Sequence, residues 1–138
     1  IESIEDRVMH MDALRQLQDR TNGFKAFIPL KFRRSNNDLS YIKETTLIED
    51  LKMYALSRIY LDNFKHIKAY WPMLGQKFAS LTLSFGADDM DGTINDSTVI
   101  YSRAGVQNES LQMTSDGMKQ YIIKAGFTPV ERDATYMV

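Results

Sequence analysis

Residues 66–71 of the chain read HIKAYW, and the alternation of apolar and polar side chains along them decides the fold. One face of the strand that this pattern predicts is apolar and the other is polar: Ile67, Ala69 and Trp71 against His66, Lys68 and Tyr70. Residues 80–85 (SLTLSF) repeat the alternation and predict another strand. A parallel sheet covered by helices on both faces is apolar throughout. A polar face therefore favours a barrel wall whose lumen holds a polar ligand.

Helices are predicted on either side of these strands. Ser3 and Thr46 begin two of them, because each side chain can accept a hydrogen bond from a backbone N–H of the first turn. We expect helices over residues 3–22, 46–61, 72–78 and 114–125, and a first strand over residues 24–32 that frays at Pro29. The expected buried sides of the first two helices are their apolar stripes: Ile4, Val8, Met11, Leu14 and Leu17 in one, and Ile48, Leu51, Ala55 and Ile59 in the other.

The order of these elements indicates parallel strands. Helices and strands alternate along the chain, which is typical of right-handed crossovers between neighbouring strands. Three strands cannot close a barrel, because closure takes eight strands and about 250 residues. The predicted fold class is α/β: a partial (βα) barrel of the TIM type, with a C-terminal helix followed by an extended tail over residues 127–133. Residues 1–138 are expected to form this single part-barrel domain.

Composition excludes several classes of function. The chain has 138 residues, of which 43% are hydrophobic and 25% charged, the balance of a globular domain. A net charge of −1 provides no basic surface for nucleic acid, and no apolar run is long enough for a membrane span. We therefore expect a cytoplasmic protein. The absence of cysteine excludes disulfides, thiol nucleophiles and cysteine-bound metal clusters in this chain. Because the first residue is Ile1, we expect an N-terminus made by processing or by design.

Residues 86–93 (GADDMDGT) carry three carboxylates and two glycines, directly after a predicted strand. The carboxyl ends of strands are where parallel α/β folds place ligands, so a ligand-facing role is favoured over a solvated acidic turn. A calcium loop does not fit. With Gly92 at the sixth position, Ala87 would be the first ligand and Thr98 the twelfth.

Lys68 stands within an apolar strand and needs a partner, which is either a loop carboxylate or an anionic substrate. His66 is placed at the amino end of the same strand, in packed surroundings or in water. Lys31 begins a basic run with Arg33 and Arg34 that favours a solvated surface over an anion contact.

Two further placements are structural. Arg58 and Asp62 are four residues apart and are expected to pair across one helical turn. His10 is expected on a helix surface, and Trp71 and Tyr70 in the core and the lumen lining.

Four stretches resemble the C-terminal half of the aminofutalosine synthase family of radical S-adenosylmethionine enzymes. They are residues 1–32, residues 57–75 (SRIYLDNFKHIKAYWPMLG), residues 83–93 (LSFGADDMDGT) and residues 129–136 (PVERDATY). The resemblance runs nearly the whole chain, with the motifs in the family's order. The sister dehypoxanthine futalosine cyclases and deazaflavin-cofactor synthases are similar, but typically carry GAND and NIQxSW where this chain has GADD and HIKAYW.

The resemblance implies addition of a 5′-deoxyadenosyl radical to 3-[(1-carboxyvinyl)oxy]benzoate, with S-adenosylmethionine and a four-iron four-sulfur cluster as cofactors. It places one group near the nucleoside and another near the substrate carboxylates: Asp88, Asp89, Asp91 and Thr93, and Lys31, His66 and Lys68. The cluster motif CxxxCxxC is missing, so we expect no cluster and no synthase activity from this chain alone.

The implied partners are the N-terminal half of the barrel and the small-molecule substrate. Exposed sheet edges also predict a homodimer. The alternatives are a part of a sister enzyme, or a non-catalytic nucleoside-binding module.

Overall fold

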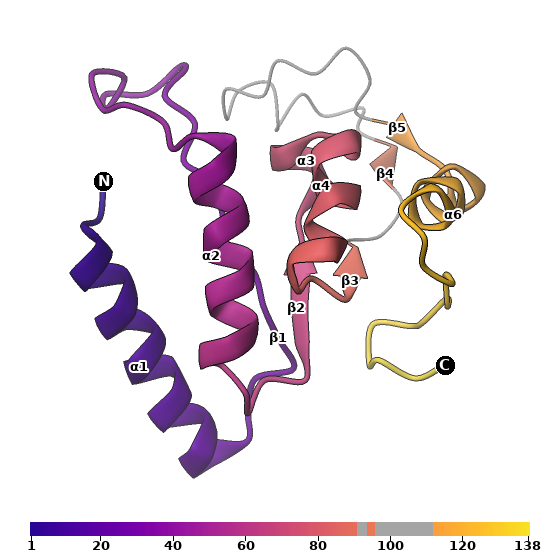
Figure 1. The fold of residues 1–138 in the computed structure, drawn as a ribbon, viewed down its shortest axis with the longest axis horizontal. Coiled ribbons are helices and arrows are strands. Elements are labelled where there is room, and N and C mark those ends of the chain that lie inside the picture. Colours follow the sequence, from indigo (N-terminus) through magenta and orange to yellow (C-terminus); the bar gives the residue numbers. More distant parts are fainter. Residues whose placement is uncertain (91–93, 96–111) are drawn as a thin grey trace.

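A computed structural model describes residues 1–90, 94–95 and 112–138 of the chain. Its centre is an open sheet of three parallel strands, β1 (Ala26–Phe27), β2 (His66–Ala69) and β3 (Asp89–Met90), in the order β1-β2-β3. Helices alternate with these strands along the chain (Figure 1). The α/β class and the parallel strands are therefore confirmed.

The main helices begin and end close to the predicted residues. Ser3 and Thr46 form capping boxes with Asp6 and Glu49, and Thr114 caps the last helix. The elements outside the sheet are α1 (Ile4–Thr21), α2 (Leu47–Tyr60), α3 (Trp71–Leu74), α4 (Gln76–Thr82), the 3₁₀ helix η1 (Leu83–Phe85), α6 (Ser115–Lys124) and an antiparallel pair, β4 (Ile94–Asn95) with β5 (Gln112–Met113).

The strand predicted over residues 80–85 is wrong, because these residues continue α4 and form η1. Ala79 and Thr82 are fully buried, three residues apart, while Leu81 is 45% exposed. That spacing fits one side of a helix packed on the sheet. The third strand instead lies at Asp89–Met90, within the segment predicted as a loop.

The buried sides of α1 and α2 also differ from the predicted stripes. In α2, Tyr54 and Ser57 are buried, whereas Ile48 and Ile59 are 66% and 77% exposed. In α1, Met11 is buried against Ser57, but Ile4 at its start is 75% exposed. The reason is that α1 packs beside α2 through its middle and end (Figure 1). The side of α2 that faces the sheet bears Tyr54, whose hydroxyl contacts the carbonyls of Pro29 and Lys68.

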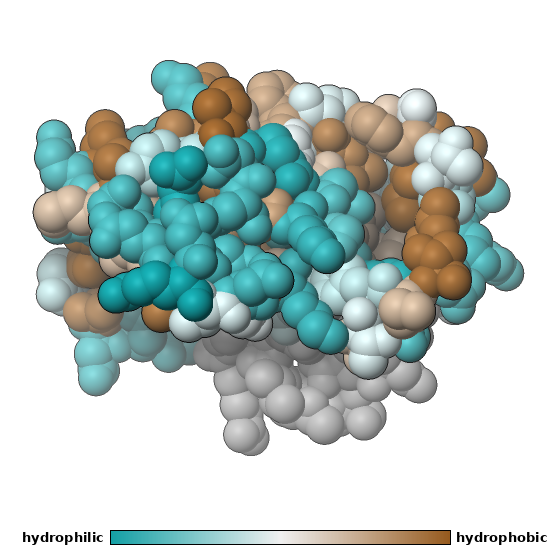
Figure 2. Space-filling view, turned by 90° about the horizontal axis from the view of Figure 1, so that it is seen from below, coloured by the Kyte–Doolittle hydropathy of each residue, from teal (hydrophilic) through white to brown (hydrophobic). Residues whose placement is uncertain are grey.

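One core cluster joins the layers. It contains Met11, Tyr54, Leu61, Phe64, Ile67, Ala69, Trp71, Leu74, Ala79, Ala87, Met90 and Met113. Hydrophilic side chains cover the centre of the face seen in Figure 2. Within the described segments, no helix combines the length and the apolar character that crossing a membrane requires.

Candidate functional site on the polar face of the sheet

The alternation along β2 separates two environments, as the sequence predicts. Ile67 and Ala69 are fully buried, and His66 and Lys68 on the opposite face are half-buried. The parallel register places Lys68 beside Asp89 of β3. The polar face of the sheet therefore brings an ammonium and a carboxylate together from two neighbouring strands.

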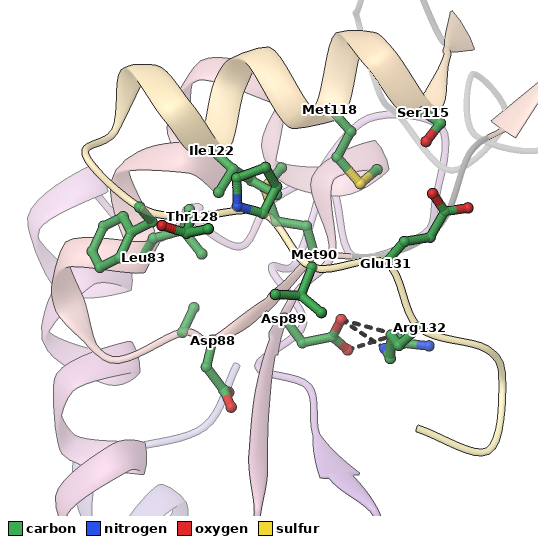
Figure 3. Close-up of a pocket in the computed structure, with 14 residues that line it drawn as sticks. Leu83, Asp88, Asp89, Met90, Ser115, Met118, Ile122, Thr128, Glu131 and Arg132 are labelled. Carbon is green, nitrogen blue, oxygen red and sulfur yellow. Dashed lines mark hydrogen bonds and ion pairs between the residues drawn. The ribbon is translucent and has the colours of Figure 1, made fainter. Parts of the chain in front are cut away.

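Asp89 is the most heavily bonded carboxylate on this face. Its side chain is 9% exposed and accepts hydrogen bonds from Nε and Nη2 of Arg132 at 3.0 and 2.7 Å and from the hydroxyl of Tyr136 at 2.8 Å. The two-pronged contact with Arg132 is drawn in Figure 3. Lys68 Nζ lies 3.6 Å from the same carboxylate. A carboxylate this buried requires such partners, because desolvation of an unpaired charge is costly.

Asp88, which directly precedes β3, accepts hydrogen bonds from a second set of donors. It accepts from Arg58 Nη2 at 2.5 Å and from the backbone N–H of Ile67 at 2.7 Å, and it contacts His66 Nδ1 at 2.9 Å. Arg58 also donates from Nε to the carbonyl of Gly86 at 2.8 Å. Asp88 thus joins α2, β2 and β3 at one point.

The predicted pair of Arg58 with Asp62 is wrong. Asp62 pairs with Arg15 of α1 at 2.9 Å, and Arg58 turns instead to Asp88. The reason is that the chain path brings Asp88, 30 residues away in sequence, to the side of α2 that bears Arg58.

Tyr136 comes from the C-terminal tail and lies among these charges. Its ring stacks on His66 with centroids 4.3 Å apart and an angle of 18° between the planes, and Arg132 Cζ lies 4.0 Å from its centroid. The ring of Tyr136 thus contacts both a histidine and an arginine of the polar face. Burial, followed by the hydrogen bond to Asp89 and the charge of that carboxylate, raises the pKa of Tyr136.

We call seven residues the polar-face cluster: Arg58, His66, Lys68, Asp88, Asp89, Arg132 and Tyr136. Sequence reasoning proposed four of them for a site. It missed Arg132, which lies in the tail expected over residues 127–133, and Tyr136, which follows that tail and was given no role. The PVERDATY motif contains both of them and was the available signal.

The remaining predicted site residues lie elsewhere. Lys31 donates to the carbonyl of Thr45 at 2.8 Å and forms an ion pair with Asp50, and neither partner belongs to the polar-face cluster. Asp91 and Thr93 lie outside the described residues. The acidic residues that are described precede and begin a strand, and do not follow one as predicted.

A cavity of about 520 Å³ adjoins the cluster, between β3, α6 and the tail. Met118 and Ile122 of α6 point toward Met90, while Asp88 points away from them (Figure 3). Apolar side chains dominate its lining. Over the described segments, no group of three His, Cys, Asp or Glu residues is arranged to hold a metal ion.

Comparison with known proteins gives a consistent result. Residues 21–138 match the family described as the CofH/MqnC C-terminal region. The chain is 43% identical over 140 residues to an aminodeoxyfutalosine synthase of Thermus thermophilus, covering 99% of this chain and 37% of that protein. It is 37% identical over 135 residues to a cyclic dehypoxanthine futalosine synthase of Streptomyces coelicolor, covering 98% and 33%.

A more distant relative has a different named activity. The chain is 36% identical over 139 residues to a 5-amino-6-(D-ribitylamino)uracil–L-tyrosine 4-hydroxyphenyl transferase of Methanoculleus marisnigri, covering 98% of this chain and 37% of that protein. The chain spans little more than a third of the length of the curated relatives that it matches.

Proposed function

This chain belongs to the CofH/MqnC C-terminal region family, and on that premise we propose that it is the C-terminal part of a radical S-adenosylmethionine enzyme with aminodeoxyfutalosine synthase activity. The observation that carries the proposal is the 43% identity to the synthase of Thermus thermophilus along 99% of the chain. A second synthase, of Streptomyces coelicolor, is 36% identical, beside 37% and 36% for the sister activities. The GADD and HIKAYW motifs support the same choice.

We further propose that the open sheet is part of a (βα)₈ barrel, with its polar face turned to the lumen. Three parallel strands with helices on their apolar face support this arrangement. The N-terminal part of the barrel is then the principal partner. The outer strands of the described sheet, β1 and β3, are the edges through which a second copy could pair.

The proposed roles follow from exposure and charge. His66 and Lys68 lie on the polar face and would receive the carboxylates of 3-[(1-carboxyvinyl)oxy]benzoate. The Asp88 side chain is 40% exposed and could accept from a ribose hydroxyl, a role that Asp91 and Thr93 would share. The ion pair of Lys31 with Asp50 supports a structural role for that lysine.

An iron–sulfur cluster does not fit the residues of this chain. Such clusters are held by thiolates, and the chain has no cysteine. The cluster would require ligands from another part of the enzyme. We therefore expect no synthase activity from residues 1–138 alone.

A sister enzyme is the second candidate, because the cyclase relative at 37% identity lies between the two synthases at 43% and 36%. A nucleoside-binding module without catalysis is the third. Ligand preference separates them: the synthase binds the enol ether, the cyclase binds dehypoxanthine futalosine, and the module binds a nucleoside alone.

Calorimetry with the chain tests the proposal. We expect 3-[(1-carboxyvinyl)oxy]benzoate to bind, and Lys68→Met to weaken binding about tenfold through loss of one charge contact. Lys52→Met, at an exposed position of α2, is the control and should bind as the unchanged chain does. Preference for dehypoxanthine futalosine would favour the cyclase, and equal binding by both lysine variants would refute the role of Lys68.

A further inference from the structure

The proposed function leaves the C-terminal tail without a role. Tyr136 nevertheless contacts three residues of the polar-face cluster through different atoms: its hydroxyl donates to Asp89, and its ring contacts His66 and Arg132. It also lies 5.7 Å from Lys68 Nζ, measured to the ring centroid.

We propose that Tyr136 is a positioning residue: its ring holds the imidazole of His66 in the plane in which Nδ1 donates to Asp88, which leaves Nε2, as the second N–H of the imidazolium form, to donate to a ligand carboxylate. The inference rests on the proposed function only in that His66 faces the ligand. The placement of the imidazole is a separate claim that can be measured without any ligand.

The geometry of His66 carries the argument. An imidazole turns about the bond that joins it to Cβ, and this torsion is broad when nothing packs against the ring. The contact of His66 Nδ1 with Asp88 at 2.9 Å fixes one edge of the imidazole. The ring of Tyr136, stacked on it with centroids 4.3 Å apart, fixes the plane of the imidazole. A carboxylate at Nδ1 selects the tautomer with hydrogen on that nitrogen, as second partners of histidine do in other sites.

Tyr136 is itself held by a turn that the tail builds. Its φ angle is 66°, which is uncommon for an aromatic residue. The Asp133 carboxylate accepts from the backbone N–H groups of Thr135 and Met137 at 2.7 and 3.0 Å, and the Asp133 N–H donates to the carbonyl of Met137 at 3.0 Å. Backbone in this region persists where the surrounding contacts enforce it, which supports a defined position for the ring.

Arg132 completes the support. It binds Asp89 with two nitrogens and packs against the ring of Tyr136. Asp89 is consequently bound to both tail residues, so the buried carboxylate of β3 anchors the tail over the polar face. The tail thereby links Asp89 to the imidazole of His66.

Nitrogen-detected NMR of the histidine side chains tests this positioning. The chain has two histidines, and the exposed His10 on α1 provides an internal control for the tautomer mixture of a solvated ring. We expect ¹⁵N shifts for His66 that show hydrogen on Nδ1, with its ring protons displaced by the stacked tyrosine. Tyr136→Leu should remove both signatures, and Tyr136→Phe, which keeps the ring, should retain the displacement. The signals of His10 should stay in place in both variants.

Calorimetry with 3-[(1-carboxyvinyl)oxy]benzoate then separates the two proposals. We expect Tyr136→Leu to bind about tenfold more weakly, and Tyr136→Phe about threefold or less. Unchanged His66 signals in folded Tyr136→Leu would overturn the positioning role. Full affinity of Tyr136→Leu for this ligand would also overturn the positioning role, provided that His66→Ala loses binding. If His66→Ala and Lys68→Met both bind normally, the proposed function fails, and the NMR comparison still decides the role of Tyr136.

Discussion

Asp88 and Asp89 are neighbours in sequence but hold different parts of the molecule. Asp88 joins Arg58 of α2 to His66 of β2, and Asp89 holds the tail through Arg132 and Tyr136. The two carboxylates differ in position: Asp88 precedes β3 and lies against Arg58 and His66, whereas Asp89 begins β3 and lies beside Lys68 and the tail. Two adjacent carboxylates can therefore serve as two separate anchors.

Gly86 makes the Asp88 anchor possible and provides a test at the residue scale. Its φ is 104°, and a Cβ at this position would lie 2.6 Å from Cβ of Arg58. We expect Gly86→Ala to lower the free energy of unfolding by about 3 kcal/mol, since backbone strain and a steric clash add. Gly126→Ala, with φ 90° and nothing within 4 Å, is the matched control and should cost about 1 kcal/mol. Urea unfolding measures both, and equal losses would contradict the clash.

The helices show how local signals and packing contribute separately. The capping boxes at Ser3 and Thr46 have the same pattern, in which the hydroxyl accepts from a backbone N–H and the acid side chain accepts from the cap. Their surroundings differ. The helix that Thr46 begins carries buried Tyr54 and Ser57, whereas the first turn of α1 is exposed.

This contrast gives a prediction at the element scale. We expect Thr46→Ala to lower the free energy of unfolding by about 1 kcal/mol, because α2 unfolds with the core. Ser3→Ala should change it by less than about 0.5 kcal/mol, since the first turn of α1 can fray without disturbing the rest. Urea unfolding curves of the two variants provide the measurement. A larger loss from Ser3→Ala would show that α1 packs along its whole length.

At the scale of the whole molecule, tyrosines limit stability at high pH. Burial raises the pKa of Tyr54 above its ordinary range, and burial with the Asp89 contact raises that of Tyr136. In each case the neutral phenol is favoured in the folded state. The stability from these groups is therefore complete below the unfolded pKa of about 10, and it is lost as pH rises through the higher folded value.

We accordingly expect the free energy of unfolding to fall from pH 9 to pH 11, where about 10 is the unfolded midpoint. Tyr136→Phe should reduce the steepness of this fall, because it removes one of the responsible hydroxyls. Tyr41→Phe, at a residue that is 78% exposed, should leave it unchanged. Urea unfolding across the pH series supplies the data, and an identical pH profile for Tyr136→Phe would argue against its docked position.

Prediction from sequence succeeded for features that a few neighbouring residues specify. The caps at Ser3 and Thr46 and the two faces of residues 66–69 were of this kind. It failed at residues 80–85, where the alternation of a strand and the spacing of a helix are both present in a short segment. Packing of Ala79 and Thr82 against the sheet selected the helix.

The sequence by itself determined the helix starts, the polar face of β2, the α/β class and the family. These depend on periodicity, on capping chemistry and on motifs, all of which can be read from residues close together in the chain. Only the tertiary structure decided that Arg58 meets Asp88 across 30 residues, and that Tyr136 meets Asp89 across 47. Such pairs depend on the path of the whole chain, since any of several carboxylates could have accepted a hydrogen bond from Arg58 or from Tyr136. The fold selects among them by burying Asp89. Among the described residues, its charged partners are Arg132 of the tail and Lys68 of β2.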